Sequence, residues 1–235
     1  MRELRLWTAA VAAPAAAAGF YALGVLRRRR SLHPTGVGYQ GELLVDNDGR
    51  PGATHTALLR FSRGAGLPEP LPDALGVAVK LPDAHGPGAD QDLLLTRSLD
   101  RPLLRRLLFP ARSFLRRAFS TALPYDLDGK RVVLLLVPAP TRNRRSPGGL
   151  AHGGGALAEL RATAADGLGF ELRIAGTFGP SQRLAILTVG QPLSAEQTEA
   201  LRFNPWTTGP GIHPSGWLNL LRDAAYRASQ RGRRG

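Results

Sequence analysis

Eight short segments rich in β-branched and apolar residues follow one another after residue 36, and they limit the fold of this chain most strongly. Clusters of Gly, Pro and Asp separate them, such as Asp46–Gly49 and Asp166–Gly167, and such clusters mark turns between strands. In Phe170–Ile174 apolar and polar residues alternate, which is typical of a strand with one buried and one wet face. We therefore predict a closed or nearly closed antiparallel barrel. The predicted strands are Val37–Val45, Thr54–Ser62, Leu75–Leu81, Leu93–Thr96, Arg131–Val137, Ala156–Thr163, Phe170–Ala175 and Arg183–Val189.

Helical patterns interrupt these strands at two places. Leu99–Ser120 has apolar residues at helical spacing, with Asp100 as a candidate N-cap and Pro110 as a kink or break. Ser194–Gln197 has the pattern of a capping box, which predicts a short helix that ends near Leu201.

The composition excludes several kinds of site. The chain has 235 residues and no cysteine, so disulfides, thiol catalysis and cysteine-ligated metals are excluded. Its formal net charge is +13, carried by 29 arginines and two lysines against 18 acidic residues, a balance that invites a nucleic-acid or membrane partner. The arginines are scattered and no aromatic-rich binding motif accompanies them, so we expect no specific nucleic-acid partner.

The N-terminus contains 21 residues without a charge, Leu6–Leu26, followed by Arg27–Arg30. This length can span a bilayer, and a run of arginines after it fits a signal-peptide cleavage site poorly. Alanine dominates the segment and Pro14 interrupts it, so a helix packed on the domain is the alternative. We predict an N-terminal apolar helix at residues 1–30, a candidate membrane anchor, and one domain at 31–235. The expected localisation is cytoplasmic, or membrane-associated through this segment.

The C-terminal segment carries Arg222 and Tyr226, four residues apart. Ser215 can cap a helix that continues through both, and residues at this spacing share a helix face. A guanidinium beside a phenol hydroxyl stabilises the phenolate and lowers a pKa that starts near about 10. A phenolate is one of the protein ligands of haem iron. By itself the pair also fits a helix face with a surface arginine and a packing tyrosine.

The residues around this pair resemble the haem-ligand segment of the catalase superfamily, especially its short, single-domain bacterial members. The matching residues are Phe203–Trp206, Pro210–Pro214, Ser215, Arg222, Ala225, Tyr226, Ser229 and Arg231. The resemblance implies an α+β fold: a catalase-like antiparallel eight-stranded β-barrel with peripheral helices and a C-terminal haem-ligand helix. It also implies haem b as cofactor, with Tyr226 as the iron ligand and with Arg222 and Arg233 as cofactor-binding residues.

Arg30 and His33, followed by Gly36 and Gly38, resemble the family's segment on the opposite, distal side of the haem. A neutral imidazole there takes a proton from a peroxide and returns it to the departing oxygen, so the resemblance implies a catalytic role for His33. It implies a cofactor-binding role for Arg30.

A longer block, from Arg60 to Phe109, matches the family pattern without insertion or deletion. The resemblance implies that Arg60 binds haem propionates, for which a planar guanidinium is suited. It implies that Ser62 supports the distal His33 and that Phe109 stacks on the porphyrin. One departure affects the chemistry: Thr96 stands where true catalases have the distal asparagine, and we count Thr96 with the catalytic residues.

These features predict a haem-dependent oxidoreductase that reacts with hydrogen peroxide or organic hydroperoxides, a peroxidase with weak catalase activity, using a peroxide substrate and a small-molecule reductant. Haem-dependent rearrangement of fatty-acid hydroperoxides and a non-enzymatic relic of the catalase fold are the alternatives. A hydrolase such as a phosphodiesterase is less favoured, because the five histidines show no metal-ligand spacing and no Gly-x-Ser-x-Gly motif is present. The oligomeric state stays open.

Overall fold

The computed structural model describes residues 35–47, 50–64, 66–68, 71–139, 155–176 and 178–215. Strands dominate these residues, and helices are few. The elements in chain order are β1 (Thr35–Asn47), β2 (Arg50–Arg63), β3 (Leu75–Leu81), β4 (Gln91–Arg97), the 3-10 turn η1 (Leu104–Arg106), β5 (Phe119–Ser120), β6 (Tyr125–Leu127), β7 (Lys130–Pro138), α2 (Ala156–Ala165), β8 (Gly169–Ala175), β9 (Gln182–Pro192), α3 (Ala195–Ala200) and β10 (Ile212–Pro214).

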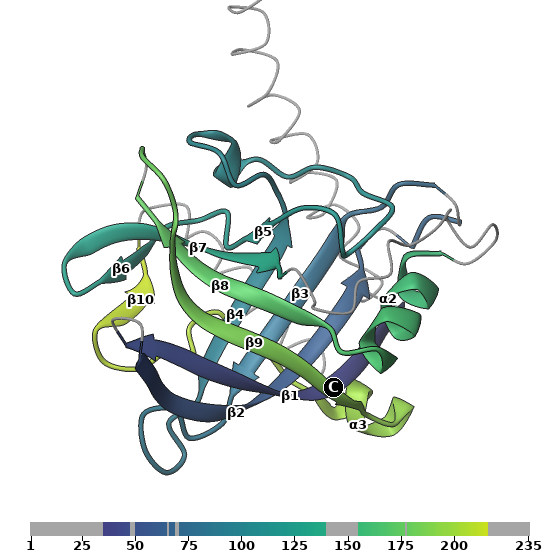
Figure 1. Ribbon diagram of the computed structural model, residues 1–235, viewed down its shortest axis with the longest axis horizontal. Coiled ribbons are helices and arrows are strands. Elements are labelled where there is room, and N and C mark those ends of the chain that lie inside the picture. Colours follow the sequence, from purple (N-terminus) through teal and green to yellow (C-terminus); the bar gives the residue numbers. More distant parts are fainter. Residues whose placement is uncertain are drawn as a thin grey trace, which may run out of the picture.

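Eight of the strands close into an antiparallel barrel (Figure 1). Their order is β7-β5-β4-β3-β2-β1-β9-β8, and pairing of β7 with β8 joins the two ends of the sheet. Strands β6 and β10 extend the sheet beside β7. The predicted closed, antiparallel eight-stranded barrel is therefore confirmed.

Large apolar side chains fill the inside of the barrel because alternate residues of each strand point inward. Phe61 of β2 is fully buried and lies edge-on to Phe114, with ring centres 5.5 Å apart. Phe170 of β8 lies 5.8 Å from Phe61 on another side. Each such side chain contributes about 1.5–3 kcal/mol when fully buried, so this aromatic cluster is a main source of stability.

The two α-helices cover neighbouring parts of the barrel near the start of β1 (Figure 1). Helix α2 inserts Leu157 and Leu160 into the core. In α3, Ser194 and Gln197 form the predicted capping box, so this prediction is confirmed. The helix lies so close to β1 that a Cβ at Gly38 would be 2.5 Å from the hydroxyl oxygen of Thr198, and only glycine fits there.

Two predicted elements are wrong. Ala156–Thr163 is helical, not a strand, because its Ala, Leu, Glu and Arg residues are strong helix formers. The eighth barrel strand is β5, which has only two residues. Leu99–Ser120 is not a helix: within it the structure forms the turn η1 and β5. Asp100 does not cap a helix there, because its carboxylate accepts hydrogen bonds from Arg105 and Ser181.

In the ranges that the structure describes, no helix is both long and apolar enough to cross a bilayer. The predicted helix at residues 1–30 and the predicted haem-ligand helix after Ser215 lie outside the described residues.

Candidate functional site

A row of small residues crosses the outer face of the barrel from β1 to β5. Pairing places Gly36 opposite Ser62, Ser62 opposite Gly76, Gly76 opposite Thr96, and Thr96 opposite Ser120. Residues paired directly across antiparallel strands have their side chains on the same face, and the chain neighbours of these residues fill the barrel core. The small-residue row therefore carries no large side chain on the outside of five strands, and Ser62 and Ser120 within it are buried.

Arg60 lies beside this row, in the next outward position of β2. It pairs with Gly38 of β1 and with Ala78 of β3. A Cβ at Gly36 would be 3.2 Å from Arg60 Nε and 2.9 Å from the carbonyl oxygen of Phe61, so the missing side chain at Gly36 allows the arginine to lie close to β1. Partial burial lowers the pKa of Arg60.

The charges of α3 and the residues after it act on the same guanidinium. Glu199 raises the pKa of Arg60, and Arg202 lowers it. Helix α3 thus brings one carboxylate near a half-buried cation at the edge of the small-residue row.

The three hydroxyl groups within the row differ in their hydrogen bonding. Ser120 is fully buried, and its Oγ donates to the carbonyl oxygen of Arg105. Ser62 is 7% exposed, and its Oγ donates to the carbonyl oxygen of Gly76 at 3.4 Å. Thr96 Oγ1 is buried and has no hydrogen-bond partner among the described residues. An unpaired buried hydroxyl costs about 1–3 kcal/mol, so Thr96 is suited to a polar group that comes from outside the described chain.

Phe109 is held next to the row through its backbone. Its N–H donates to the carbonyl oxygen of Arg97 at 3.1 Å, and Arg97 directly follows Thr96 on β4. The segment after η1 therefore returns to the strand that carries the unpaired hydroxyl.

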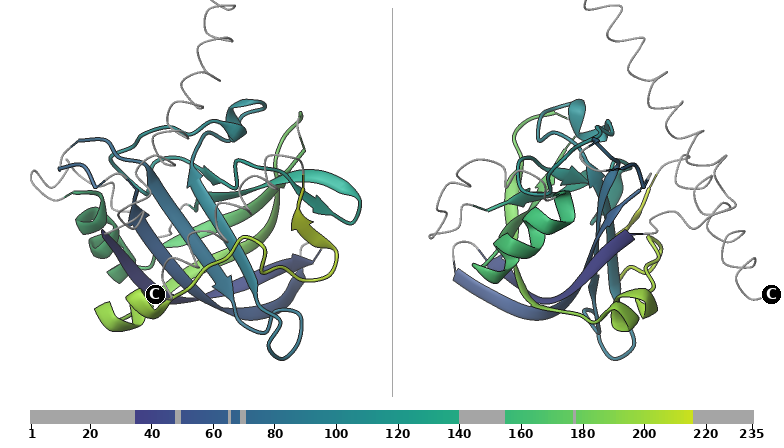
Figure 2. Two further views of the ribbon diagram at one scale, coloured as in Figure 1. Left: turned by 180° about the vertical axis from the view of Figure 1, so that it is seen from behind. Right: turned by 90° about the vertical axis from the view of Figure 1, so that its right-hand side faces the viewer.

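The chain after α3 crosses the outer face of β3 and β4 on its way to β10 (Figure 2). Asp92 of β4 anchors this crossing: its Oδ2 accepts from Asn204 N at 2.7 Å, and its own N–H donates to the oxygen of Thr207 at 2.8 Å. Asp92 is buried, which raises its pKa, while Lys80 at 2.7 Å and the Asn204 N–H oppose that rise. The Asn-Pro-Trp segment is thereby fixed on the same side of the barrel as Arg60.

Ser215 is the last described residue of the segment that crosses β3 and β4. Its N–H donates to the oxygen of Pro124 at 2.9 Å, and Pro124 lies shortly after Ser120. One end of the small-residue row lies at the start of β1, which follows His33 by two residues in the sequence. The other end lies on β5, and Ser215, which precedes the segment with Arg222 in the sequence, is bonded to Pro124 a few residues after β5.

A cavity of about 730 Å³ opens near the start of β1. Residues of β1, α2, β9 and α3 line it, among them Gly36, Tyr39, Arg161, Val189 and Leu193. Its wall is mainly apolar, and Arg161 is a cationic group at its margin. Burial raises the pKa of Tyr39, and Arg161 partly opposes this effect. The volume and the lining suit a molecule with an apolar body and an anionic end.

Four of the predicted site residues can be placed, and they lie together. Arg60, Ser62 and Thr96 share one face of three adjacent strands, and Phe109 is bonded to the neighbour of Thr96. The other predicted site residues lie outside the described residues: Arg30, His33, Arg222, Tyr226 and Arg233.

Sequence reasoning missed the rest of the row, namely Gly36, Gly76 and Ser120 as members of one surface. A signal was present in Gly76–Lys80, where small residues alternate with valine. This pattern places the valines in the core and leaves only small side chains at Gly76 and Ala78 on the other face. The sequence does not give the register between strands, so it does not show which residues of the neighbouring strands lie beside Gly76.

In the described part of the chain, no three His, Asp or Glu side chains lie together as metal ligands. A search against known protein families and a search of curated proteins each find no match for this chain.

Proposed function

We propose that this protein is a haem-dependent oxidoreductase that reacts with hydrogen peroxide or organic hydroperoxides, mainly as a peroxidase. The observation that supports this most is the strand register, which brings Ser62 and Thr96 into one row with Arg60 beside them. The resemblance to the catalase superfamily assigns the same three residues to a haem pocket.

The described residues fit a haem group in three respects. Between Gly36 and Thr96 the small-residue row carries no large side chain, which suits the close approach of a flat macrocycle. Arg60 is a half-buried cation suited to a propionate. Thr96 Oγ1 is a buried hydroxyl without a partner among the described residues. When bound, haem supplies the iron centre at which a peroxide reacts.

Residues outside the described ranges complete the proposal. Tyr226, with Arg222 beside it on a helix, would be the iron ligand, and Arg30 and Arg233 would contact the cofactor. His33 would take a proton from the peroxide and return it to the departing oxygen. Ser62, whose Oγ donates to Gly76, would support the His33 ring.

Thr96 is the reason to favour peroxidase over catalase turnover. A threonine hydroxyl is shorter than the asparagine amide that true catalases place here, and it offers one donor. We expect peroxide cleavage to persist while the orientation of a second hydrogen peroxide is weakened.

The absorption spectrum of the full chain, purified from haem-supplemented cells, tests the proposal. We expect a Soret band with a high-spin ferric profile, which Tyr226→Phe abolishes. His33→Ala should keep the band and lose peroxide reactivity by about 10²-fold or more. Protein that stays colourless after haem reconstitution would refute haem binding and favour a non-enzymatic relic of the fold.

The cavity near the start of β1 favours a second candidate, the rearrangement of fatty-acid hydroperoxides. Its apolar wall and Arg161 suit a long acyl chain that ends in a carboxylate. Incubation of the haem-loaded protein with a fatty-acid hydroperoxide separates the two reactions. A peroxidase consumes reductant in proportion to product, whereas a rearrangement consumes the hydroperoxide with no reductant present.

A further inference from the structure

Two loops at one end of the barrel expose large apolar side chains to solvent. Leu103, directly before η1, is 63% exposed, and Phe178, between β8 and β9, is 73% exposed. Figures 1 and 2 place η1 and the β8–β9 tip at the same end of the barrel. We call this pair the apolar tip. Exposed apolar groups of this size are unfavourable in water and mark sites of interaction when they occur together.

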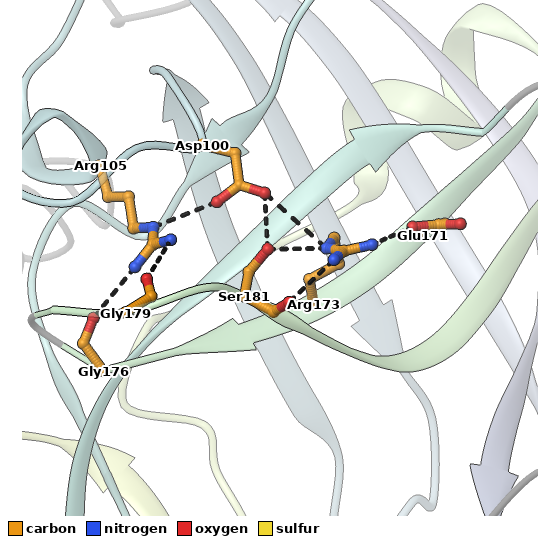
Figure 3. A network of polar contacts seen from close by, with 7 residues as sticks. All are labelled: Asp100, Arg105, Glu171, Arg173, Gly176, Gly179 and Ser181. Carbon is orange, nitrogen blue, oxygen red and sulfur yellow. Dashed lines mark hydrogen bonds and ion pairs between the residues drawn. The ribbon is translucent and has the colours of Figure 1, made fainter.

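A single buried arginine ties the two loops together (Figure 3). Arg105 of η1 is 3% exposed. Its Nη1 and Nη2 donate to the carbonyl oxygens of Gly176 and Gly179, at 3.3 and 3.0 Å, and its Nε donates to Asp100 at 3.1 Å. Because Leu103 and Phe178 are close in sequence to these contacts, the apolar tip is held on a fixed base.

A second arginine strengthens that base from β8. Asp100 Oδ2 accepts from Ser181 Oγ at 2.6 Å, and Arg173 donates through Nε and Nη2 to the hydroxyl and carbonyl oxygens of Ser181, both at 2.8 Å. Leu103 itself has a positive φ of 66°, which a leucine adopts only at a cost. The exposed side chain of Leu103 therefore stands on a strained backbone that the Arg105 and Arg173 network holds in place.

The segment that carries Leu103 is strongly basic. Residues 100–117 contain six arginines and one acidic residue, Asp100, and Asp100 is already bonded to the buried Arg105. The other five are exposed to solvent: Arg101, Arg106, Arg112, Arg116 and Arg117. Exposed apolar groups among arginines complement a surface with acyl chains below and negative head groups above.

A second exposed apolar pair on the barrel provides a contrast. Leu44 of β1 and Ile186 of β9 are paired in register, and each is 37% exposed. Here arginines and carboxylates balance: Glu171, which pairs with Ile186 in register, forms an ion pair with Arg173, and Asp46 forms one with Arg183. This strand pair therefore lies in less basic surroundings than the segment that carries Leu103.

We propose that the apolar tip is a docking site for the surface of an anionic lipid bilayer. Leu103 and Phe178 enter the interface between head groups and acyl chains, and the arginines of residues 100–117 contact the head groups. Lipid is favoured over nucleic acid because leucine adds nothing to base stacking, whereas both side chains gain from burial in lipid. This inference does not depend on haem binding.

The absence of cysteine from the chain permits a position-specific test. The full-length variants Phe178→Cys and Ile186→Cys are each labelled with a polarity-sensitive fluorophore. They are mixed with vesicles of phosphatidylcholine alone or of equal parts phosphatidylcholine and phosphatidylglycerol. We expect a blue shift, and quenching by nitroxide-labelled lipid, only for the label at position 178 and only with the anionic vesicles.

The label position separates this docking from membrane contact through residues 1–30. Vesicle binding that leaves the label at position 178 in water would overturn the proposal, and so would equal shifts at both positions or a failure to bind. Binding to RNA without any response to vesicles would instead indicate a nucleic-acid surface.

A pair of double variants gives an independent measure. Leu103→Asn with Phe178→Ser should lower the affinity for the anionic vesicles by about tenfold or more, because asparagine tolerates a positive φ and the buried apolar area is lost. Leu44→Ser with Ile186→Ser removes a comparable exposed pair and should leave the affinity unchanged. Circular dichroism confirms that both variants fold, and equal affinities of the two would contradict the proposal.

Discussion

Two arginines near the same edge of the barrel are almost equally buried and have opposite surroundings. Arg105 is 3% exposed and Arg97 is 5% exposed. Arg105 donates to one carboxylate and two carbonyl oxygens. Arg97 lies over the ring of Phe119, 5.6 Å from its centre, and its Nη1 is buried with no hydrogen-bond partner in the described part of the chain.

The pKa of Arg97 reflects its surroundings. Burial, together with the nearby positive charge of Arg117, lowers the pKa of Arg97 to about 10. A guanidinium removed from water loses its hydration, and only ionic or hydrogen-bonding partners can replace it. The network around Arg105 provides those partners, whereas the Phe119 ring provides only a weak attraction.

A buried charge can therefore join elements of the fold, as Arg105 does, or lower its stability, as we expect of Arg97. Arg105 links η1 to the β8–β9 tip, which are far apart in sequence. The Arg97 side chain contacts the Phe119 ring but forms no hydrogen bond or ion pair among the described residues, so its presence is better explained by a ligand or by another part of the chain than by stability.

Removing the arginine that joins the two loops should have the largest effect. Arg105→Ala leaves Asp100 and two carbonyl oxygens without their donor, so we expect the free energy of unfolding to fall by about 3–5 kcal/mol. Urea denaturation followed by circular dichroism measures this. A loss below about 1 kcal/mol would show that the network behaves like a surface ion pair and would remove the contrast with Arg97.

Replacing the other arginine should have the opposite sign. Arg97→Met removes a desolvated charge and keeps the apolar stem, so we expect the free energy of unfolding to rise by about 1–3 kcal/mol. If the variant is instead less stable, Arg97 has a partner, and adding anions such as phosphate to the native protein should then stabilise it.

The effect of Arg97→Met on stability should also depend on pH. The folded pKa of Arg97 is about 10, below its usual value, so the unfolded state binds more protons only between these two values. The contribution of Arg97 to the free energy of unfolding therefore rises with pH only above about pH 10, where the guanidinium loses its charge. The difference between Arg97→Met and the native protein should be constant from pH 6 to about 9 and shrink at higher pH.

The barrel could be predicted from the sequence because strand alternation and turn residues are local signals. The errors arise where local signals fail: β5 is two residues long, and Leu99–Ser120 is shaped by Arg105, whose partners lie 71 and 74 residues further along the chain. Helical spacing in that segment comes from leucines that do not share one buried face: Leu115 is buried, whereas Leu103 and Leu108 are exposed.

The candidate site, too, could be predicted from the sequence only in part. Arg60, Ser62 and Thr96 were named from a resemblance, and their sharing of one face follows from strand alternation. The additional members Gly36, Gly76 and Ser120 depend on register across five strands, which is a long-range property. The hydroxyl of Thr96 and the Nη1 of Arg97, which have no hydrogen-bond partner among the described residues, depend on packing, for which a single sequence carries no signal.

Two buried serines provide the smallest and most direct test of the comparison. Ser181, beside Arg105, is hydrogen-bonded to Asp100 and Arg173, whereas Ser98, next to Arg97, is fully buried and its Oγ has no partner in the described ranges. Ser181→Ala should lower the free energy of unfolding by about 1–2 kcal/mol, while Ser98→Ala should leave it unchanged or raise it slightly, because it removes an unsatisfied hydroxyl. Thermal and urea unfolding of the two variants under one condition measure this difference. Equal losses would mean that Ser98 has a partner of its own, and the neighbourhood of Arg97 would then be a second polar network, equivalent to the one around Arg105.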